Sequence, residues 1–350
     1  TLIDPAPLGT PHPLAESTDI SKVVRMDYGA DADYTELGER AIAMWRREPL
    51  FHETGVMFLS KVPLSGFERD SYELLTARGH KLERLDANAI ADRFPAWRRG
   101  AYVDGYFNAQ GGWAESGAVV ESWNVQARAA GVEVRSGRVE RVTDDGVIVD
   151  GVALRADLVL IAAGSWVPLL VPELAPALRA VGQPVFHLRP SDPSLFAAHH
   201  FPVFGADISR TGYYGFPANA DGIVKIANHG TGTLLAPGDD GRVVTADQEA
   251  ALRDMLRDTF PALVDAPIVH RRLCVYCDTA DENFWIARHP QRPSLVVATG
   301  GSGHAFKFAP VLGDVIADIA LGIPHPLAHK FRWRPELTAP LGTEAARHHG

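Results

Sequence analysis

An apolar segment that runs into a glycine-rich turn and then into an amphipathic segment constrains the fold of this chain more than any other feature. Leu295–Val297 has the composition of a buried strand, and ATGGSGHAFKF follows at 298–308. Apolar residues then recur at helical spacing over 310–321, with Pro310 suited to a first turn and Gly322 to a helix end. The order predicts a strand, a tight turn and a helix whose N-terminal end favours an anionic ligand.

Two side chains that can take part in chemistry lie within this turn, His304 and Lys307. Phe306 and Phe308 flank the lysine, and because both favour burial, Lys307 is expected in the same buried wall. The alternative is that its ammonium reaches the solvent while only the stem is buried. Both interpretations are open from this segment alone.

Length and charge narrow the class of protein. With 350 residues, 46% hydrophobic and 22% charged, the chain suits one large domain or two interleaved domains. A net charge of −9 argues against nucleic acid or an anionic membrane as partner. The sequence contains no run of about eighteen apolar residues, the length needed to span a bilayer, and no signal peptide is recognisable. Two cysteines in 350 residues suit a reducing compartment, so a cytoplasmic protein is expected. The printed sequence starts at Thr1 rather than Met, and its natural start is expected upstream.

Apolar periodicity predicts strands that alternate with helices and then give way to strands. Helices are expected at 34–45, 71–78, 86–94, 117–130 (N-cap Ser116) and 245–260 (capping box Thr245 and Gln248). Strands are expected at 1–3, 55–59, 132–135, 139–142, 147–149, 158–162, 185–188, 212–216, 223–228 and 271–277. The strands between 132 and 149 are expected to form a meander, and residues 338–350 a loose tail.

A second glycine signal follows the apolar strand at 158–162. Ala162, Ala163 and Gly164 are small residues that let a backbone approach a flat ligand or a phosphate, although an ordinary turn is the alternative. Asp4 ends the first strand of the chain. An acid at that place in a dinucleotide-binding fold typically binds a ribose hydroxyl, but most such acids are only turn residues.

The two cysteines form the sequence CVYC at 274–277. No second CxxC completes a zinc site, so no metal is expected. On a strand, Cys274 and Tyr276 share one face while Cys277 points to the other, which argues against a disulfide. The alternative for Cys274 is a small buried hydrophobe. The same alternation places Lys225 and His229 on one face of their strand, opposite the core-facing Val224 and Ile226.

Together these segments resemble the monomeric sarcosine oxidase and fructosyl-amino-acid oxidase family of flavoproteins, which have the D-amino-acid-oxidase-like fold. The resemblance covers Thr1 to about Leu337 and rests on six segments in the same order. They are SKVVR at 21–25, GGWAES at 111–116, YYGFP at 213–217, VKIANHG at 224–230, RRLCVYCDT at 271–279 and GGSGHAFKF at 300–308. The resemblance implies a two-lobed α/β (α+β) protein, in which a Rossmann-like FAD domain is interleaved with a mixed-sheet substrate domain. The FAD domain would comprise 1–52, 113–170 and 280–337, and the substrate domain 53–112 and 171–279.

The resemblance also assigns roles to single residues. It implies that Arg25 and Lys307 bind the substrate carboxylate and that Lys225 lies over the flavin ring and assists the reaction with oxygen. The substrate cavity would be lined by His229, Tyr214 and Tyr276. FAD would be bonded covalently through the sulfur of Cys274. Further cofactor contacts are implied for Asp4, Ser17, Lys22, Val139, Ala163, Gly164, Trp166, Gly301, Gly303, His304 and Lys307.

The implied activity is flavin-dependent oxidation of the C–N bond of a secondary amino acid, either N-methyl or sugar-derived N-alkyl. A hydride would pass to FAD and O2 would be reduced to H2O2, so the expected partners are a small amine and O2, with a monomeric protein. Lys307 and the helix at 310–321 would stabilise the negative charge that grows on the flavin. The alternative among enzymes is an amine dehydrogenase that uses another electron acceptor.

One departure from the family pattern concerns GxGxxG, the fingerprint that follows the first strand of a dinucleotide fold. This motif does not occur in the printed sequence. In the family it belongs to a strand, turn and helix of roughly 25 residues that would precede the strand ending at Asp4. The segment lies upstream, or the chain is half of a split protein, or flavin binding has been lost and a binding protein remains. Retention of Cys274, Lys225, Arg25 and Lys307 argues against loss.

Overall fold

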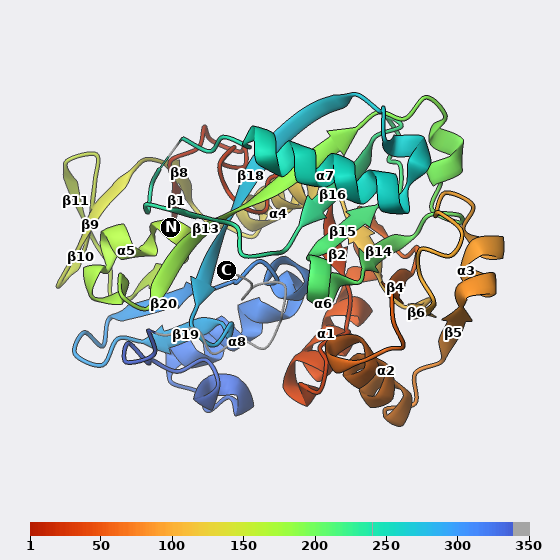
Figure 1. Cartoon of the computed structure of the whole chain (residues 1–350). Helices are drawn as coiled ribbons and strands as arrows, with labels where there is room; N and C mark the ends of the chain where they lie inside the picture. Colours follow the sequence, from red (N-terminus) through yellow and green to blue (C-terminus); the bar gives the residue numbers. More distant parts are fainter. Residues whose placement is uncertain (240, 339–350) are drawn as a thin grey trace.

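Two long antiparallel strands, β13 (Leu178–Leu188) and β18 (Ile268–Thr279), form the centre of the computed structural model, which describes residues 1–239 and 241–338. Both are buried over most of their length. Figure 1 shows them crossing the molecule from the region of β19 (Trp285–Arg288) and β20 (Leu295–Thr299) to the region beneath helix α7 (Ala246–Thr259). They therefore connect the two ends of the fold.

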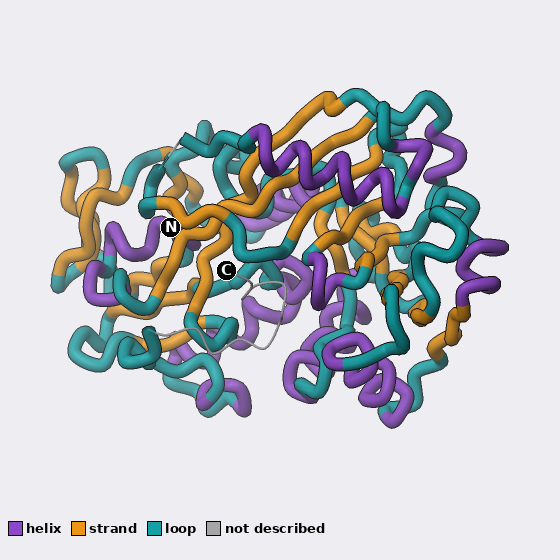
Figure 2. The backbone as a smooth tube through the Cα atoms, viewed as in Figure 1, coloured by secondary structure: helices purple, strands orange, loops and turns teal. Residues whose placement is uncertain are grey.

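β13 and β18 belong to a mixed nine-stranded sheet. Its order is β17-β13-β16-β15-β14-β4-β6-β5, with β18 also paired to β13, and only the β14–β4 pair is parallel. The other strands are β17 (Thr233–Leu235), β16 (Val224–Asn228), β15 (Tyr213–Phe216), β14 (Val203–Ala206), β4 (Val56–Ser60), β6 (Asp104–Asn108) and β5 (Leu82–Asp86). Helix α7 lies across one face of this sheet (Figure 2).

The packing of α7 confirms two expectations. Its predicted capping box is present, because the Thr245 hydroxyl accepts from the Gln248 backbone while the Gln248 side chain accepts from the Thr245 backbone. Val224 and Ile226 of β16 lie in the same buried cluster as Leu256 of α7. The predicted alternation of β16 is therefore confirmed, and the other face of the strand is left for the site.

Four smaller sheets cover the rest of the fold. β1 (Leu2–Asp4) pairs in parallel with β8 (Val134–Ser136), and β12 (Val159–Ile161) pairs in parallel with β20, which also pairs with β19. The third sheet contains β9 (Val139–Thr143), β10 (Gly146–Val149) and β11 (Val152–Arg155). The fourth contains β2 (Lys22–Val24), β7 (Gly112–Ala114) and β3 (Phe51–His52).

The strand, turn and helix predicted at 295–321 are confirmed, with one addition. After β20 and the glycine turn, a short 3-10 turn at Phe306–Phe308 precedes α8 (Ala309–Leu321). Gly322 ends α8 with φ +75°, a conformation that glycine adopts without strain. The remaining helices are α1 (Ala32–Trp45), α2 (Gly66–Ala77), α3 (Ala87–Arg93), α4 (Ser116–Ala129), α5 (Val167–Leu170) and α6 (Ile208–Thr211).

Four local predictions were wrong in detail. β8 is not part of the meander, because it pairs in parallel with β1, far away in sequence. Helix α2 begins at Gly66, before its first periodic apolar residue. β13 is longer than the predicted strand because β18 pairs with it throughout. Ser116 is the first helical residue rather than the N-cap, and its hydroxyl donates to the Asp19 carbonyl.

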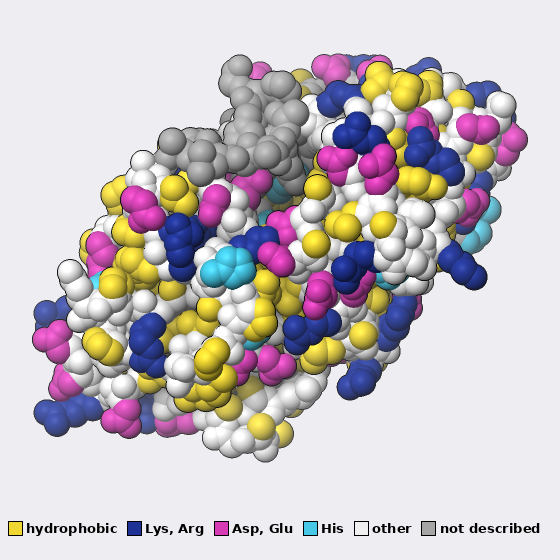
Figure 3. Space-filling model, turned by 90° about the horizontal axis from the view of Figure 1, so that it is seen from below, with side chains coloured by type: hydrophobic (Ala, Val, Ile, Leu, Met, Phe, Trp, Pro, Cys, Tyr) yellow, Lys and Arg dark blue, Asp and Glu magenta, His cyan; other side chains and the backbone are white. Residues whose placement is uncertain are grey.

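The surface seen in Figure 3 carries mixed charge, and the described residues include no membrane-spanning helix. Acidic and basic side chains are interspersed on the face seen in Figure 3. Among residues 1–239 and 241–338, no helix has the length and apolar character needed to cross a membrane. The tail predicted at 338–350 falls outside the described residues except for Thr338.

Candidate active site

A cavity of about 690 Å³ lies where the nine-stranded sheet meets β2 and the turn before α8. This volume is within the range of small-molecule sites. Apolar and aromatic side chains of β4, β14 and β15 form much of its wall. The predicted site residues that line it are Lys22, Arg25, Tyr214, His229, Tyr276, Gly303, His304 and Lys307.

Lys307 is buried in the wall of this cavity. Only 3% of the residue is exposed, and its ammonium donates to the Tyr28 hydroxyl at 2.9 Å and to the His304 carbonyl at 3.0 Å. The alternative in which the ammonium reaches the solvent was wrong, because the 3-10 turn directs the side chain inward between two phenylalanines. A fixed positive charge therefore faces the cavity.

Arg25 supplies a second cation. Its guanidinium carbon lies 4.9 Å from the ring centroid of Tyr28 and 5.5 Å from that of Phe67, and Nη1 donates to the Asp27 carbonyl. The rings stabilise the cation through their negative faces. A guanidinium has five N–H donors, so a single backbone carbonyl leaves capacity for a carboxylate ligand.

Cys274 lies on β18 with only 2% of the residue exposed, and the Lys22 ammonium is 3.2 Å from its sulfur. Burial disfavours the charged form of Lys22, but the negative charge of Cys274 and Glu16 outweighs burial and raises the pKa of Lys22. The sulfur of Cys274 thus lies in contact with a lysine that lines the cavity.

The opposite orientation of the two cysteines is confirmed. Cys274 packs with Tyr276 and Ala227, whereas Cys277 packs in the separate cluster beneath β12 and β20. The Cys277 sulfur lies 3.3 Å from the Thr299 hydroxyl, and burial raises the pKa of its thiol to about 11. The two sulfurs therefore have different surroundings, and both cysteines are free thiols.

Lys225 forms a buried ion pair that the sequence did not indicate. Its ammonium is 2.6 Å from Asp19 Oδ2 and donates to the Ser21 carbonyl at 2.5 Å, and each charged side chain is only 1% exposed. The other carboxylate oxygen lies 3.1 Å from Nε2 of His187. Burial lowers the pKa of Lys225 to about 8, although Asp19 opposes this shift. Burial would raise the pKa of Asp19, but Lys225 and the His187 hydrogen bond hold it well below its usual value.

Lys225 does not line the main cavity, unlike His229 on the same strand face. It lines a small adjoining space with Ser21 and Trp113. Phe216 lines both spaces, and its ring centroid lies 4.6 Å from the Lys225 ammonium. The ammonium is thus separated from the cavity by one aromatic side chain.

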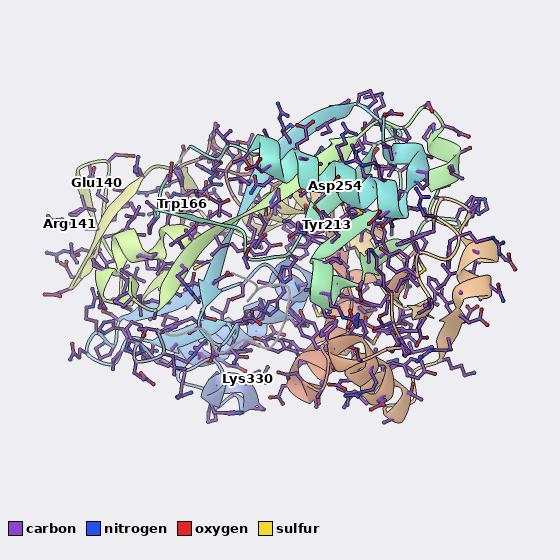
Figure 4. All side chains as sticks on the ribbon, viewed as in Figure 1. Glu140, Arg141, Trp166, Tyr213, Asp254 and Lys330 are labelled. Atoms are coloured by element: carbon purple, nitrogen blue, oxygen red, sulfur yellow. The ribbon has the colours of Figure 1, made fainter. Side chains whose placement is uncertain are left out.

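Eight of the predicted cofactor residues do not line the cavity: Asp4, Ser17, Val139, Ala163, Gly164, Trp166, Cys274 and Gly301. Cys274 lies directly behind the wall, in contact with Lys22. Asp4 accepts from the Ala6 backbone at 2.8 Å, as a turn residue does. The Gly164 carbonyl accepts from the Thr299 hydroxyl at 3.0 Å, which places this loop beside the end of β20. Trp166 contacts the Arg242 guanidinium, and Figure 4 shows it on the same side of the molecule as Glu140 and Arg141 of β9.

Three residues of the site were missed by the sequence analysis: Asp19, His187 and Tyr28. Each matters through a contact with a residue far along the chain, such as Asp19 with Lys225. Local periodicity carries no information on such pairs. Proximity of Asp19 and Tyr28 to Lys22 and Arg25 in sequence was the only available signal.

The arrangement fits a flat aromatic cofactor. Gly303 has φ +74°, and a Cβ at this position would lie 2.2 Å from the Tyr276 ring, so the backbone there needs glycine. Lys22, Arg25 and Lys307 line this space, and Lys22 lies 3.2 Å from the sulfur of Cys274, which is buried behind the wall. Within 1–239 and 241–338 no three His, Cys, Asp or Glu side chains are grouped to bind a metal ion.

Comparisons with known proteins agree with this arrangement. The DAO family, described as "FAD dependent oxidoreductase", matches residues 11–319. N-methyl-L-tryptophan oxidase of Salmonella dublin is 32% identical over 326 residues, which cover 89% of this chain and 86% of that protein. Fructosamine oxidase (Amadoriase II) of Aspergillus fumigatus has a TM-score of 0.78 at 24% identity, covering 93% of this chain and 81% of the other. Fructosyl peptide oxidase from E. terrenum has a TM-score of 0.79 at 22% identity, covering 93% and 85%.

The first prediction concerns the charge of Lys225. Its ammonium should lose a proton near pH 8, so the side chain should be cationic below that pH and neutral above it. Asp19→Asn should lower the midpoint further, because the carboxylate is the group that opposes burial. The midpoint is measured by NMR from the ε-carbon shift of labelled lysine, with the signal assigned by its loss in Lys225→Met. A midpoint near 10 that Asp19→Asn does not move would contradict the buried pair.

Proposed function

The chain belongs to the DAO family of FAD-dependent oxidoreductases, and from this premise we propose that it oxidises the C–N bond of an N-methyl or fructosyl-type amino acid, with O2 as electron acceptor and H2O2 as product. The observation that carries the proposal is the cavity that brings Arg25 and Lys307 together beside Tyr276 and the buried Cys274. Such a site offers two cations to an amino acid and a sulfur to a cofactor.

The cofactor residues fall into two groups in this proposal. Lys22, Cys274, Gly303, His304 and Lys307 hold the flavin ring, and Cys274 bonds it covalently. Asp4, Ser17, Val139, Ala163, Gly164, Trp166 and Gly301 hold the rest of FAD, on segments that lie away from the cavity. FAD supplies the acceptor for the hydride of the substrate carbon and passes the electrons on. The FAD lobe comprises 1–52, 113–170 and 280–337, and 53–112 with 171–279 form the substrate lobe.

Arg25 and Lys307 act on the substrate by binding its carboxylate. The guanidinium provides a planar fork held by Tyr28 and Phe67, and the Lys307 ammonium provides a point charge fixed by Tyr28 and His304. Lys307 is buried and Arg25 is half-buried, so each interacts more strongly with an anion than a fully exposed charge does. Lys307 also stabilises negative charge that develops nearby during hydride transfer, and since it needs no reorganisation its effect is large.

The remaining polar side chains of the cavity orient the amine. His229 Nδ1 lies 3.4 Å from the Tyr276 hydroxyl, and Tyr214 also lines the wall. Burial raises the pKa of Tyr214 to about 12, so this residue stays neutral and acts only as a hydrogen-bonding group. Burial also raises the pKa of Tyr276, so the two tyrosines surround the substrate without adding a full charge, and His229 lies beside them.

Lys225 acts on oxygen in this proposal. A fixed ammonium attracts the negative charge that develops on O2 as it accepts electrons, which favours O2 over a larger electron acceptor and so an oxidase over a dehydrogenase. Two free cysteines suit a reducing compartment, so we place the enzyme in the cytoplasm, as a monomer. Peroxide release from a panel of N-alkyl amino acids tests the activity. An absence of peroxide together with reduction of a dye acceptor would instead indicate the dehydrogenase.

The second prediction concerns the cofactor bond. Cys274→Ser should leave the flavin extractable by acid precipitation, whereas Cys277→Ser should not, because the two side chains face opposite ways on β18. The measurement is the flavin absorbance of the precipitate and the supernatant. Equal release from both variants would show that neither sulfur is the point of attachment.

The third prediction concerns the carboxylate. Arg25→Ala or Lys307→Met should weaken substrate binding by about 2–5 kcal/mol, the range for removing one partner of a desolvated charge pair. Analogues that lack the carboxylate serve as the matched control and should lose much less. Binding is measured by titration of the flavin spectrum under anaerobic conditions. An equal loss for both kinds of ligand would make Arg25 a structural residue.

The fourth prediction concerns oxygen. An ammonium about 4 Å from a developing anion contributes roughly 4 kcal/mol at an effective dielectric of about 20, before desolvation costs. Since each 1.4 kcal/mol or so is tenfold in rate, Lys225→Met should slow reoxidation by about two orders of magnitude or more. Anaerobic reduction by the amine should change far less. Stopped-flow spectroscopy measures the two half-reactions separately. If Lys225→Met slowed reduction as much as reoxidation, the proposed role of Lys225 in the reaction with oxygen would be wrong.

A further inference from the structure

A row of polar side chains connects buried Lys225 with the protein surface. The Lys225 ammonium lies 2.6 Å from one oxygen of Asp19, and the other oxygen lies 3.1 Å from Nε2 of His187. The His187 ring lies 4.9 Å, centroid to centroid, from the ring of His270, its partner across the β13–β18 pair. His187 is 9% exposed in its side chain, and His270 is exposed. The row therefore begins where water is excluded and ends in solvent.

Hydrogen positions along this row follow from chemistry. An ionised carboxylate only accepts hydrogen bonds, so Nε2 of His187 carries a hydrogen and donates it to Asp19. The other carboxylate oxygen accepts from Lys225. Asp19 thus lies between two side-chain donors, one on each oxygen, and Oδ1 also accepts from the Ile20 backbone at 2.7 Å. A proton received on one oxygen can leave from the other.

Oxygen chemistry creates a need for such a row, and this step rests on the proposed function. Reduction of O2 to H2O2 takes up two electrons and two protons. The reduced cofactor supplies both electrons and one proton. If the Lys225 ammonium gives the second proton, a neutral amine is left in a site that is 1% exposed. That amine must regain a proton from solvent before the next turnover.

We propose that Asp19, His187 and His270 form a proton path that returns a proton from solvent to Lys225. His270 collects the proton at the surface, His187 passes it through Nε2 to Asp19, and Asp19 passes it to the amine. Histidine suits both outer positions because its ring has two nitrogens, so that one can accept a proton while the other gives one up. Asp19, His187 and His270 are positioning and relay residues, since none of them lines the cavity.

The surrounding structure holds this row in place from two sides. The Asp19 carbonyl accepts from the Gly117 backbone at 3.0 Å and from the Ser116 hydroxyl at 2.9 Å, both at the start of α4. Arg272 of β18 donates to the carbonyls of Thr18 and Ala15, in the loop that precedes Asp19. A purely structural partner for Lys225 would not need a second, surface-connected group on the far oxygen.

Other charged groups lie close to the row and affect how proton transfer along it depends on pH. Lys22 and Cys274 face Lys225 and Asp19, and Arg272 lies beside His270. Burial, followed by the neighbouring His187, lowers the pKa of His270, so this residue is largely neutral at neutral pH and returns quickly to that form. A slower supply of protons is therefore expected as the pH rises above the range in which histidine titrates.

The test measures proton transfer directly and does not depend on turnover. In holoenzyme labelled with ¹⁵N-lysine, NMR gives the exchange rate of the Lys225 ammonium with water, with the signal assigned by Lys225→Met. His187→Gln should slow this exchange at least tenfold. The matched control is His289→Gln, since His289 is equally buried and its Nε2 lies 2.7 Å from a Glu173 oxygen, on another sheet. Only the His187 change should slow exchange.

Kinetics separates failure of this path from failure of the proposed function. In His187→Gln the first reoxidation should stay within threefold, because Lys225 begins protonated, while steady-state turnover slows and added imidazole restores it. If Lys225→Met did not slow reoxidation, the proposed oxygen chemistry would be wrong. The rate at which the Lys225 ammonium exchanges with water would still test the proton path, because that measurement does not depend on oxygen. Unchanged exchange in His187→Gln overturns the path. If that variant does not fold, His270→Gln takes its place, since His270 is exposed. Exchange should then be about threefold slower, and an unchanged rate would contradict the proposal.

Discussion

The pairing of β13 with β18 is the constraint on which the rest of the site depends. Side chains on paired strands alternate between faces, so the register directs Cys274 and Tyr276 toward one side and Cys277 toward the other. A slip of one residue would exchange these faces and turn Cys274 away from Lys22. The same register places His187 opposite His270. The proposed cofactor attachment and the proposed proton path therefore depend on one set of backbone hydrogen bonds.

Compensation of buried positive charge is the second constraint. Removing an ammonium from water is costly unless a partner replaces the lost hydration. Lys225 is paired with a full carboxylate, which opposes the effect of burial and favours the charged ammonium. Lys307 donates to a hydroxyl and a carbonyl and itself lines the cavity. Because Lys307 lines the cavity whereas Lys225 lies behind Phe216, we give Lys307 to the substrate carboxylate and Lys225 to oxygen.

Features set by neighbouring residues could be predicted from the sequence, and features set by distant pairs could not. The capping box at Thr245, the end of α8 at Gly322 and the alternation of β18 depend on local geometry, and all three are confirmed. The parallel pairing of β1 with β8 and the Asp19–Lys225 ion pair join segments far apart in the chain, and no periodicity signals them. Motifs in the right order indicated the family and the cations of the cavity, but they did not show that Lys225 lies behind Phe216.

The central claim is that this chain transfers electrons from an N-substituted amino acid to a bound flavin and then to oxygen. It is tested most directly by anaerobic titration of the purified protein with N-methyl-L-tryptophan and, separately, with a fructosyl amino acid, while the visible flavin band is recorded. The account predicts that at least one of them bleaches the band completely, and that admitted air restores it with one H2O2 per flavin. A band that neither substrate bleaches, or one that air does not restore, would contradict the account.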